Sequence, residues 1–305
     1  MKIFTDAAEQ RVQADHLFRA FLWSLLNSFC FSLMFATVKG MGEHVPLSMQ
    51  IFFRGWVNVA FVSLFLLYRR VSIRTSYWGL ILIRSISGLM ALVCFFTATR
   101  HIPVSMVATL ALLNPIYVLV VSRLLARELV SRETLFWMGL SIFGLFLAIN
   151  PDFSHVSSVV PFWVLGVMFC SGVFLGIALT AVRAATATVK PEVLMFYFLV
   201  VITLFSAPIA WIDYQPISDP EVWAGLFGIG IFATLGQLGL TMAYTYAPAP
   251  ICSVMSLMGN AFTILWGLLF FKEILTVQQG VGLLVLFLAI GTISLRGKGK
   301  KLTNS

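Results

Sequence analysis

Long apolar runs separated by short polar segments recur along the whole chain. Each run holds about 18–24 residues, enough for a helix to cross a hydrocarbon core of roughly 30 Å. Alternation with a period of two residues is absent, so helices are expected rather than the strands of a membrane barrel. We therefore predict an all-α membrane protein with ten transmembrane helices, at residues 17–38, 47–68, 77–98, 104–124, 133–149, 161–183, 192–211, 222–244, 249–271 and 277–295.

The composition agrees with this pattern. The 305 residues are 60% hydrophobic and 10% charged, and the mean hydropathy is +0.96. A soluble domain carries about 25% charged residues, and a soluble chain this apolar would expose large patches that aggregate. The composition therefore excludes a soluble globular enzyme.

Basic residues predict the orientation, because Lys and Arg are retained on the cytoplasmic side of a membrane. With the N-terminus inside, fifteen of the 20 basic residues lie in inside segments or at inside span edges. Three lie outside (Lys39, Arg100 and Lys272), and Arg54 and Arg84 lie within spans. We expect cytoplasmic termini at 1–16 and 296–305. The net charge of +8 then reflects topology, with no nucleic-acid partner.

A shift of 145 residues lays the second half of the chain over the first. The stretch 98–131 falls on 243–276, with Pro103 on Pro248 and Arg127-Glu128 on Lys272-Glu273. Each copy holds five spans, at 17–149 and 161–295, joined by a linker at 150–160. Since five is odd, the second copy enters the membrane from the opposite side, as in the inverted repeats of secondary transporters.

Three features make the chain resemble the drug/metabolite transporter superfamily, in its ten-helix branch of paired EamA-type domains. An apolar helix ends in an acid twice (LLARELVS, 124–131; LFFKEILT, 269–276), the second span holds FFR (52–54), and Pro103 and Pro248 each precede a fourth span. The resemblance implies a solute cavity between two five-helix halves, alternating access and a bacterial inner-membrane location. Arg84-Ser85 stands where some members have Arg-Gly.

Arg54 and Arg84 are the sharpest candidates for solute contact. An arginine at the membrane centre costs about 2.5–3.5 kcal/mol on insertion scales, and such residues usually face a cavity. Each lies roughly 10 Å deep, and they enter from opposite sides. No Asp or Glu falls in the interior of a span, so the two cations favour an anionic group on the solute. The alternative is that both side chains snorkel to the headgroups.

Two amides mark the middle of the fourth span of each half. Asn114, beside the helix-breaking Pro115, and Asn260 lie where inverted-repeat transporters bind solute. Alternatively, each amide bonds neighbouring helices together. Tyr117, Gln237 and Tyr244 are weaker candidates, for which simple packing is the alternative.

Glu128 and Glu273 end the fourth spans and are interpreted as helix-end anchors rather than proton carriers. The lack of acids within spans favours exchange or facilitated diffusion over proton coupling. Gly172 and Gly176 form a GxxxG pattern in the sixth span, which indicates a close helix contact within or between molecules.

Enzymatic chemistry lacks the residues it would need. The four cysteines lie on different spans without CxxC spacing, so no metal, disulfide or cofactor is expected.

We predict a secondary transporter for a small polar metabolite, amino-acid-like or nucleotide-like, with an anionic group favoured by the arginines. The alternatives are an uptake exchanger for S-adenosylmethionine-type metabolites and a membrane scaffold or receptor. A monomer or homodimer is expected.

Overall fold

The computed structural model describes residues 16–41, 45–99, 101–102, 104–149, 161–217, 219–271 and 275–296. All regular structure in these residues is helical. The helices are α2 (Leu17–Met41), α3 (Leu47–Tyr68), α4 (Trp78–Thr99), α5 (Val104–Ala111), α6 (Asn114–Leu125), α7 (Arg132–Ile149), α9 (Phe162–Ala185), α10 (Pro191–Ile212), α11 (Pro220–Tyr246), α12 (Ala249–Met255), α13 (Met258–Phe271) and α14 (Val277–Arg296).

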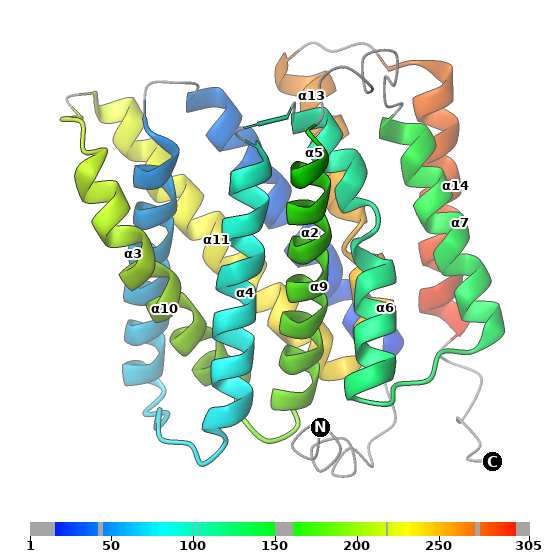
Figure 1. The fold of residues 1–305 in the computed structure, drawn as a ribbon, viewed down its shortest axis with the longest axis horizontal. Helices are drawn as coiled ribbons and strands as arrows, with labels where there is room; N and C mark the ends of the chain where they lie inside the picture. The colour runs from blue at the N-terminus through cyan, green and yellow to red at the C-terminus, as the bar shows by residue number, and fades with distance from the viewer. Residues whose placement is uncertain are drawn as a thin grey trace.

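These helices confirm the all-α membrane class. Within the described residues, nine helical segments are long and apolar enough to cross a membrane, and Thr109–Leu125 is a shorter apolar one. Together they account for the ten predicted spans. Successive spans run in alternate directions, so α2 begins and α14 ends at the same end of the bundle, drawn lowermost in Figure 1. We call this the lower end, where α6, α9 and α11 also finish, and the opposite one the upper end.

The fourth and ninth spans, predicted at residues 104–124 and 249–271, are each broken within the span. The chain turns at Leu112 and Leu113 between α5 and α6, and at Ser256 and Leu257 between α12 and α13. At both breaks the chain forms hydrogen bonds of the 3₁₀ type, in which an N–H donates to the carbonyl three residues earlier. Leu113 N, for example, donates to Leu110 O at 3.2 Å. In the first half, Pro115 has no N–H and cannot continue the α-helical ladder.

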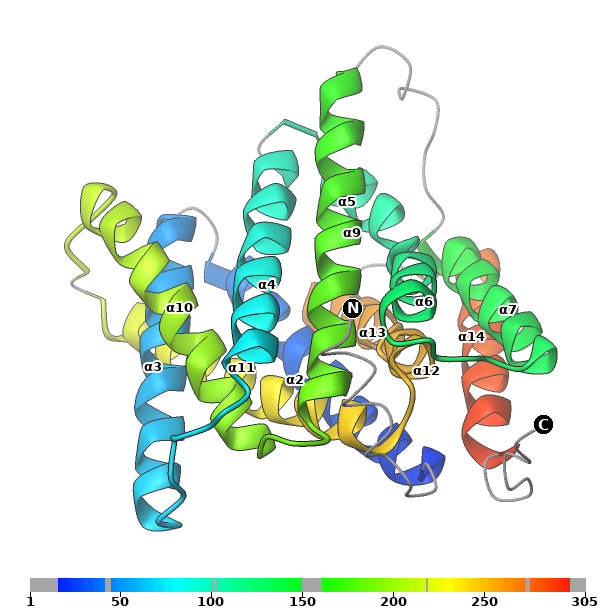
Figure 2. The same ribbon diagram turned by 60° about the horizontal axis from the view of Figure 1, so that its bottom comes forward.

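The helix pairing reveals a pseudo-twofold relation between the halves. The main helix pairs are α2 with α11, α4 with α9, α3 with α10 and α7 with α14. Exchanging each helix for its counterpart 145 residues away turns the first pair into the second and each of the others into itself. The α7–α14 pair lies at one edge of the bundle in both views (Figure 1 and Figure 2). The fold is therefore the predicted pair of inverted five-span repeats.

Candidate functional site

Arg84 in α4 is a buried cation inside the bundle. Its side chain is only 4% exposed, and its guanidinium carbon lies 3.6 Å from the ring centroid of Phe198 in α10. Gly88, one turn further along α4, leaves room for this contact, since a Cβ there would lie 2.7 Å from Phe198 Cε2. Among the described residues, no carboxylate pairs with Arg84. Its burial between helices is unlike that of a snorkelling side chain.

Arg54 in α3 lies toward the upper end and in a different environment. It is half-buried, with its guanidinium carbon 5.5 Å from the ring centroid of Phe31 in α2. The two predicted arginines thus each lie on an aromatic ring of a neighbouring helix, an arrangement that stabilises a cation in apolar surroundings. They contact different helix pairs, so the structure does not bring them to one point.

A buried polar network closes the lower end, and its central residue, Arg183, was read from sequence only as a basic span edge. Arg183 is 6% exposed at the end of α9. Its Nε donates to Glu128 Oε1 at 3.1 Å, and its Nη1 donates to the carbonyls of Tyr244 and Thr245, both at 3.2 Å. Glu128 Oε2 accepts from Ala249 N at 2.9 Å, at the start of α12.

The end of α6 positions Glu128 for this role. Arg127 adopts the left-handed conformation, with φ of 53°, and turns the chain back so that Glu128 N donates to Ser122 O at 3.3 Å. Glu128 therefore pairs with α9 and accepts a hydrogen bond at the start of α12. Its repeat counterpart, Glu273, lies outside the described residues.

Within the described residues, the two amides predicted at mid-span, Asn114 and Asn260, make no side-chain hydrogen bond at the breaks. Asn114 begins α6 and Asn260 lies in α13, both half-buried. The contact to the second break comes instead from α2, where Asn27 Nδ2 donates to Ser256 Oγ at 3.3 Å and Ser28 Oγ donates to Ser256 O at 3.4 Å. A neighbouring helix thus satisfies polar groups at the break, as a membrane interior requires.

The remaining predicted residues are packed rather than brought together. Tyr117 of α6 contacts Phe169 edge-on, with ring centroids 5.6 Å apart, and lies against Gly172 and Gly176 of α9. The GxxxG pattern therefore forms a contact within the molecule.

Two buried side chains of α11 complete the set. Gln237 is buried, and its backbone carbonyl accepts a hydrogen bond from Thr241 Oγ1 at 2.9 Å. Tyr244 is 1% exposed, and its backbone carbonyl accepts from Arg183 Nη1, the partner of Glu128. Of the predicted residues, Tyr244 and Glu128 thus meet at the lower end.

Metal-binding chemistry has no visible framework in the described part of the chain. No group of three or more His, Cys, Asp or Glu side chains comes together there. The four cysteines are free thiols, of which Cys30 and Cys252 are buried.

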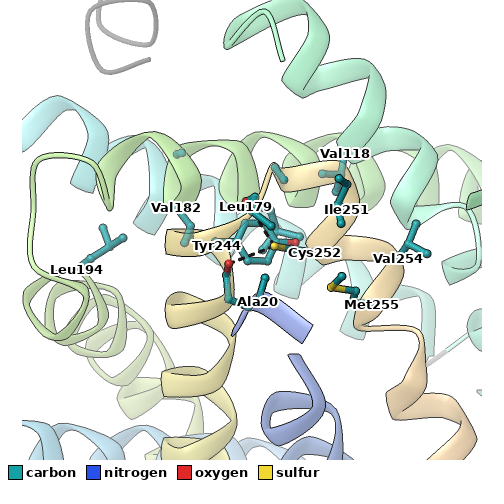
Figure 3. Packing of buried hydrophobic residues seen from close by; sticks show 14 of the residues in the cluster. Ala20, Val118, Leu179, Val182, Leu194, Tyr244, Ile251, Cys252, Val254 and Met255 are labelled. Atoms are coloured by element: carbon teal, nitrogen blue, oxygen red, sulfur yellow. Dashed lines mark hydrogen bonds between the residues drawn. The ribbon is translucent and has the colours of Figure 1, made fainter. Parts of the chain in front are cut away.

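The two ends of the bundle are packed unequally. Every residue of α9 from Ala178 to Ala185, toward the lower end, is buried. Among the counterparts in α2, Leu33 to Gly40 toward the upper end, only Met34 is buried. Likewise all of α12 is buried. Figure 3 shows the lower-end packing, where α9, α11 and α12 meet α2 through Leu179, Val182, Tyr244, Ile251, Cys252 and Ala20. Identical packing at both ends would bury these segments equally, so the lower end is the more tightly packed one.

Comparisons with known proteins agree with this two-repeat architecture. The EamA-like transporter family matches residues 18–150 and 162–295, the two repeats. The pseudopaline exporter CntI of Pseudomonas aeruginosa is 32% identical over 281 residues, covering 90% of this chain and 97% of that protein. A riboflavin transporter of Brucella anthropi is 26% identical over 185 residues, 58% of this chain and 63% of that protein. A solved crystal structure, 14% identical, has the same fold with a TM-score of 0.77 over 92% of this chain and 99% of that one.

Proposed function

The chain belongs to the EamA-like transporter family of membrane transporters, and we propose that it exports a small metabolite with an anionic group by alternating access. The lower end then faces the cytoplasm of a bacterial cell, with both termini on that side. The basic residues of the lower-end loops support this orientation, Arg69, Arg70, Arg74 and Arg127 among them.

Arg84 is the observation that carries the anionic-solute proposal. It is a buried guanidinium on an aromatic ring, with no carboxylate partner among the described residues. Attraction between unit charges 4 Å apart is about 4 kcal/mol at an effective dielectric near 20, before desolvation is subtracted. A guanidinium also offers a planar fork of donors that matches a carboxylate or a phosphate. An anionic group on the solute would supply the missing partner.

The direction of transport rests on similarity rather than on the site. The match to the pseudopaline exporter extends over nearly all of that protein, whereas the match to the riboflavin transporter extends over less of both chains. Export is therefore the proposal. Uptake of riboflavin and exchange of an S-adenosylmethionine-type metabolite are the alternatives to test beside it.

Flux and binding with purified protein test the function. Proteoliposomes are loaded in turn with glutamate, AMP, pseudopaline, riboflavin and S-adenosylmethionine, and efflux is compared with protein-free vesicles. Binding is measured as a rise in apparent thermal stability, because a ligand that binds the native state raises it. We expect efflux of at least one anionic solute, and loss of both signals in Arg84→Ala. Arg84→Lys, which keeps the charge but loses the fork, is expected to be intermediate.

Arg123→Ala is the matched control, since Arg123 is an exposed arginine on α6. It is expected to leave efflux unchanged. Movement of riboflavin or S-adenosylmethionine alone, with full activity in Arg84→Ala, would contradict the anionic-solute proposal. Absence of flux for every solute would favour the scaffold or receptor alternative.

A further inference from the structure

The Glu128–Arg183 ion pair joins four chain segments at the lower end. Glu128 follows α6, and Arg183 lies in the last turn of α9. Arg183 also holds the end of α11 through the carbonyls of Tyr244 and Thr245, while Glu128 holds the start of α12 through Ala249 N. One pair of side chains therefore ties α6, α9, α11 and α12 together.

The pair also crosses the boundary between the repeats. Glu128 belongs to the first half, and Arg183 and the segments it holds belong to the second. In an alternating-access transporter made of two halves, opening one end separates contacts of this kind. An ion pair that joins the halves at one end is then a candidate to be made in one state and broken in the other.

The burial and hydrogen bonding of the pair bear on how strongly it favours one of these two states. The side chains of Arg183 and Glu128 are only 7% and 15% exposed. Arg183 lies in the stretch of α9 in which every residue is buried. Charge-assisted hydrogen bonds are stronger than neutral ones. Both oxygens of Glu128 are engaged, and such additional hydrogen bonds are needed for the attraction between two buried charges to offset their desolvation.

We propose that the Glu128–Arg183 pair is the lock that holds the lower end closed. The proposal rests on the alternating-access part of the proposed function. Because the lock exists only in the state closed at the lower end, it stabilises that state relative to the state open there. Removing the lock shifts the population toward the lower-end-open state without removing the solute site.

Accessibility of one buried position measures this shift. Thr180 is fully buried in α9, and its hydroxyl has no hydrogen-bond partner in the described part of the chain, so a cysteine there breaks no hydrogen bond. With Cys30, Cys94, Cys170 and Cys252 replaced by alanine, Thr180→Cys is labelled with a membrane-impermeant maleimide from the lower-end side. We expect slow labelling in this background.

Three variants and one control then separate the lock from general loosening. Glu128→Gln keeps an acceptor for Ala249 N but removes the charge. Arg183→Met removes the cation of the pair and keeps the hydrogen bond from Ala249 N to Glu128. The double variant removes both charges and leaves none uncompensated, which proteins tolerate far better than one unpaired buried charge. Labelling should accelerate by about tenfold or more in all three, because the closed state loses its differential stabilisation. Arg123→Met, at an exposed arginine on α6, should label as slowly as the parent.

Each outcome decides for or against the lock. Unchanged labelling in folded Glu128→Gln and in the folded double variant overturns it. Failure of the double variant to fold also overturns it, because the pair would then be required for folding rather than for one state. Efflux of the solute is measured on the same samples. Normal efflux with unchanged labelling would contradict the lock proposal alone. Faster labelling without flux of any solute would contradict the proposed function and support the lock.

Discussion

The side-chain amide of Asn27 in α2 donates to the hydroxyl of Ser256, the residue at which the ninth span passes from α12 to α13. These residues are 229 positions apart, yet the contact joins the first span of one repeat to the broken span of the other. Ser28 adds a hydrogen bond to the carbonyl of Ser256. The break is thus supported from outside its own helix.

The first prediction concerns the strength of this contact. In a double-mutant cycle of Asn27→Ala and Ser256→Ala, we expect a coupling of about 0.6 kcal/mol and at most about 1.7, as for other interhelical hydrogen bonds in membranes. The measurement is the free energy of unfolding in detergent micelles. Thr263→Ala, at an exposed position of α13, should be additive with Asn27→Ala. Additivity in both cycles would show that the Asn27–Ser256 contact contributes nothing.

The second prediction concerns the crossing of α6 and α9. A Cβ at Gly172 would overlap the ring of Tyr117, with Tyr117 Cγ at 2.9 Å. Gly172→Ala should therefore destabilise the protein by about 1–3 kcal/mol, the usual cost of overpacking. Gly166→Ala is the control on the same helix, since nothing lies within 4 Å of a Cβ there. Tyr117→Leu should recover part of the loss. Equal thermal stability of the two glycine variants would refute the contact.

The third prediction tests the position of Arg84 without changing any charge. A Cβ at Gly88 would overlap the guanidinium of Arg84 and the ring of Phe198. Gly88→Ala should then lower affinity for an anionic solute by about tenfold, or about 1.4 kcal/mol. In an Arg84→Ala background, Gly88→Ala should add little. The control is Gly139→Ala in α7, where a Cβ meets nothing within 4 Å. A full second loss in the Arg84→Ala background would mean that Gly88 acts through packing alone.

The fourth prediction is topological. Alkaline phosphatase, which is active only outside the cytoplasm, should be inactive when fused after Arg296 and active when inserted between Asp213 and Asp219. The reason is the excess of basic residues at the lower end. A green fluorescent protein fused after Arg296 should be bright in the same cells. The opposite pattern of phosphatase activity would invert the proposed orientation.

The span pattern could be predicted from sequence because the bilayer imposes it, and the repeat because residues 145 positions apart match. A membrane helix needs a long apolar run, and such runs are visible without knowledge of the fold. The break of the ninth span at Ser256 and Leu257 was not predicted, because Pro115 marks only the break of the fourth span and no proline marks the second.

The candidate site was harder to predict because the depth of a residue in the membrane does not specify the helix against which its side chain packs. Arg54 and Arg84 looked alike in sequence, but tertiary packing leaves one half-buried on Phe31 and buries the other against Phe198. Arg183 looked like an ordinary cytoplasmic marker. Its partner Glu128 is 55 residues away, in the other repeat, and no local pattern could join them.

That the chain crosses a membrane ten times as two inverted repeats follows from the amino-acid sequence, because the length of each apolar run can be read one span at a time. Which end is packed more tightly depends on the tertiary structure. Two repeats of similar sequence can pack in two nearly equivalent ways, and long-range contacts decide between them. Those contacts, Glu128 with Arg183 and the buried α9 and α12 around them, depend on how helices from both halves meet.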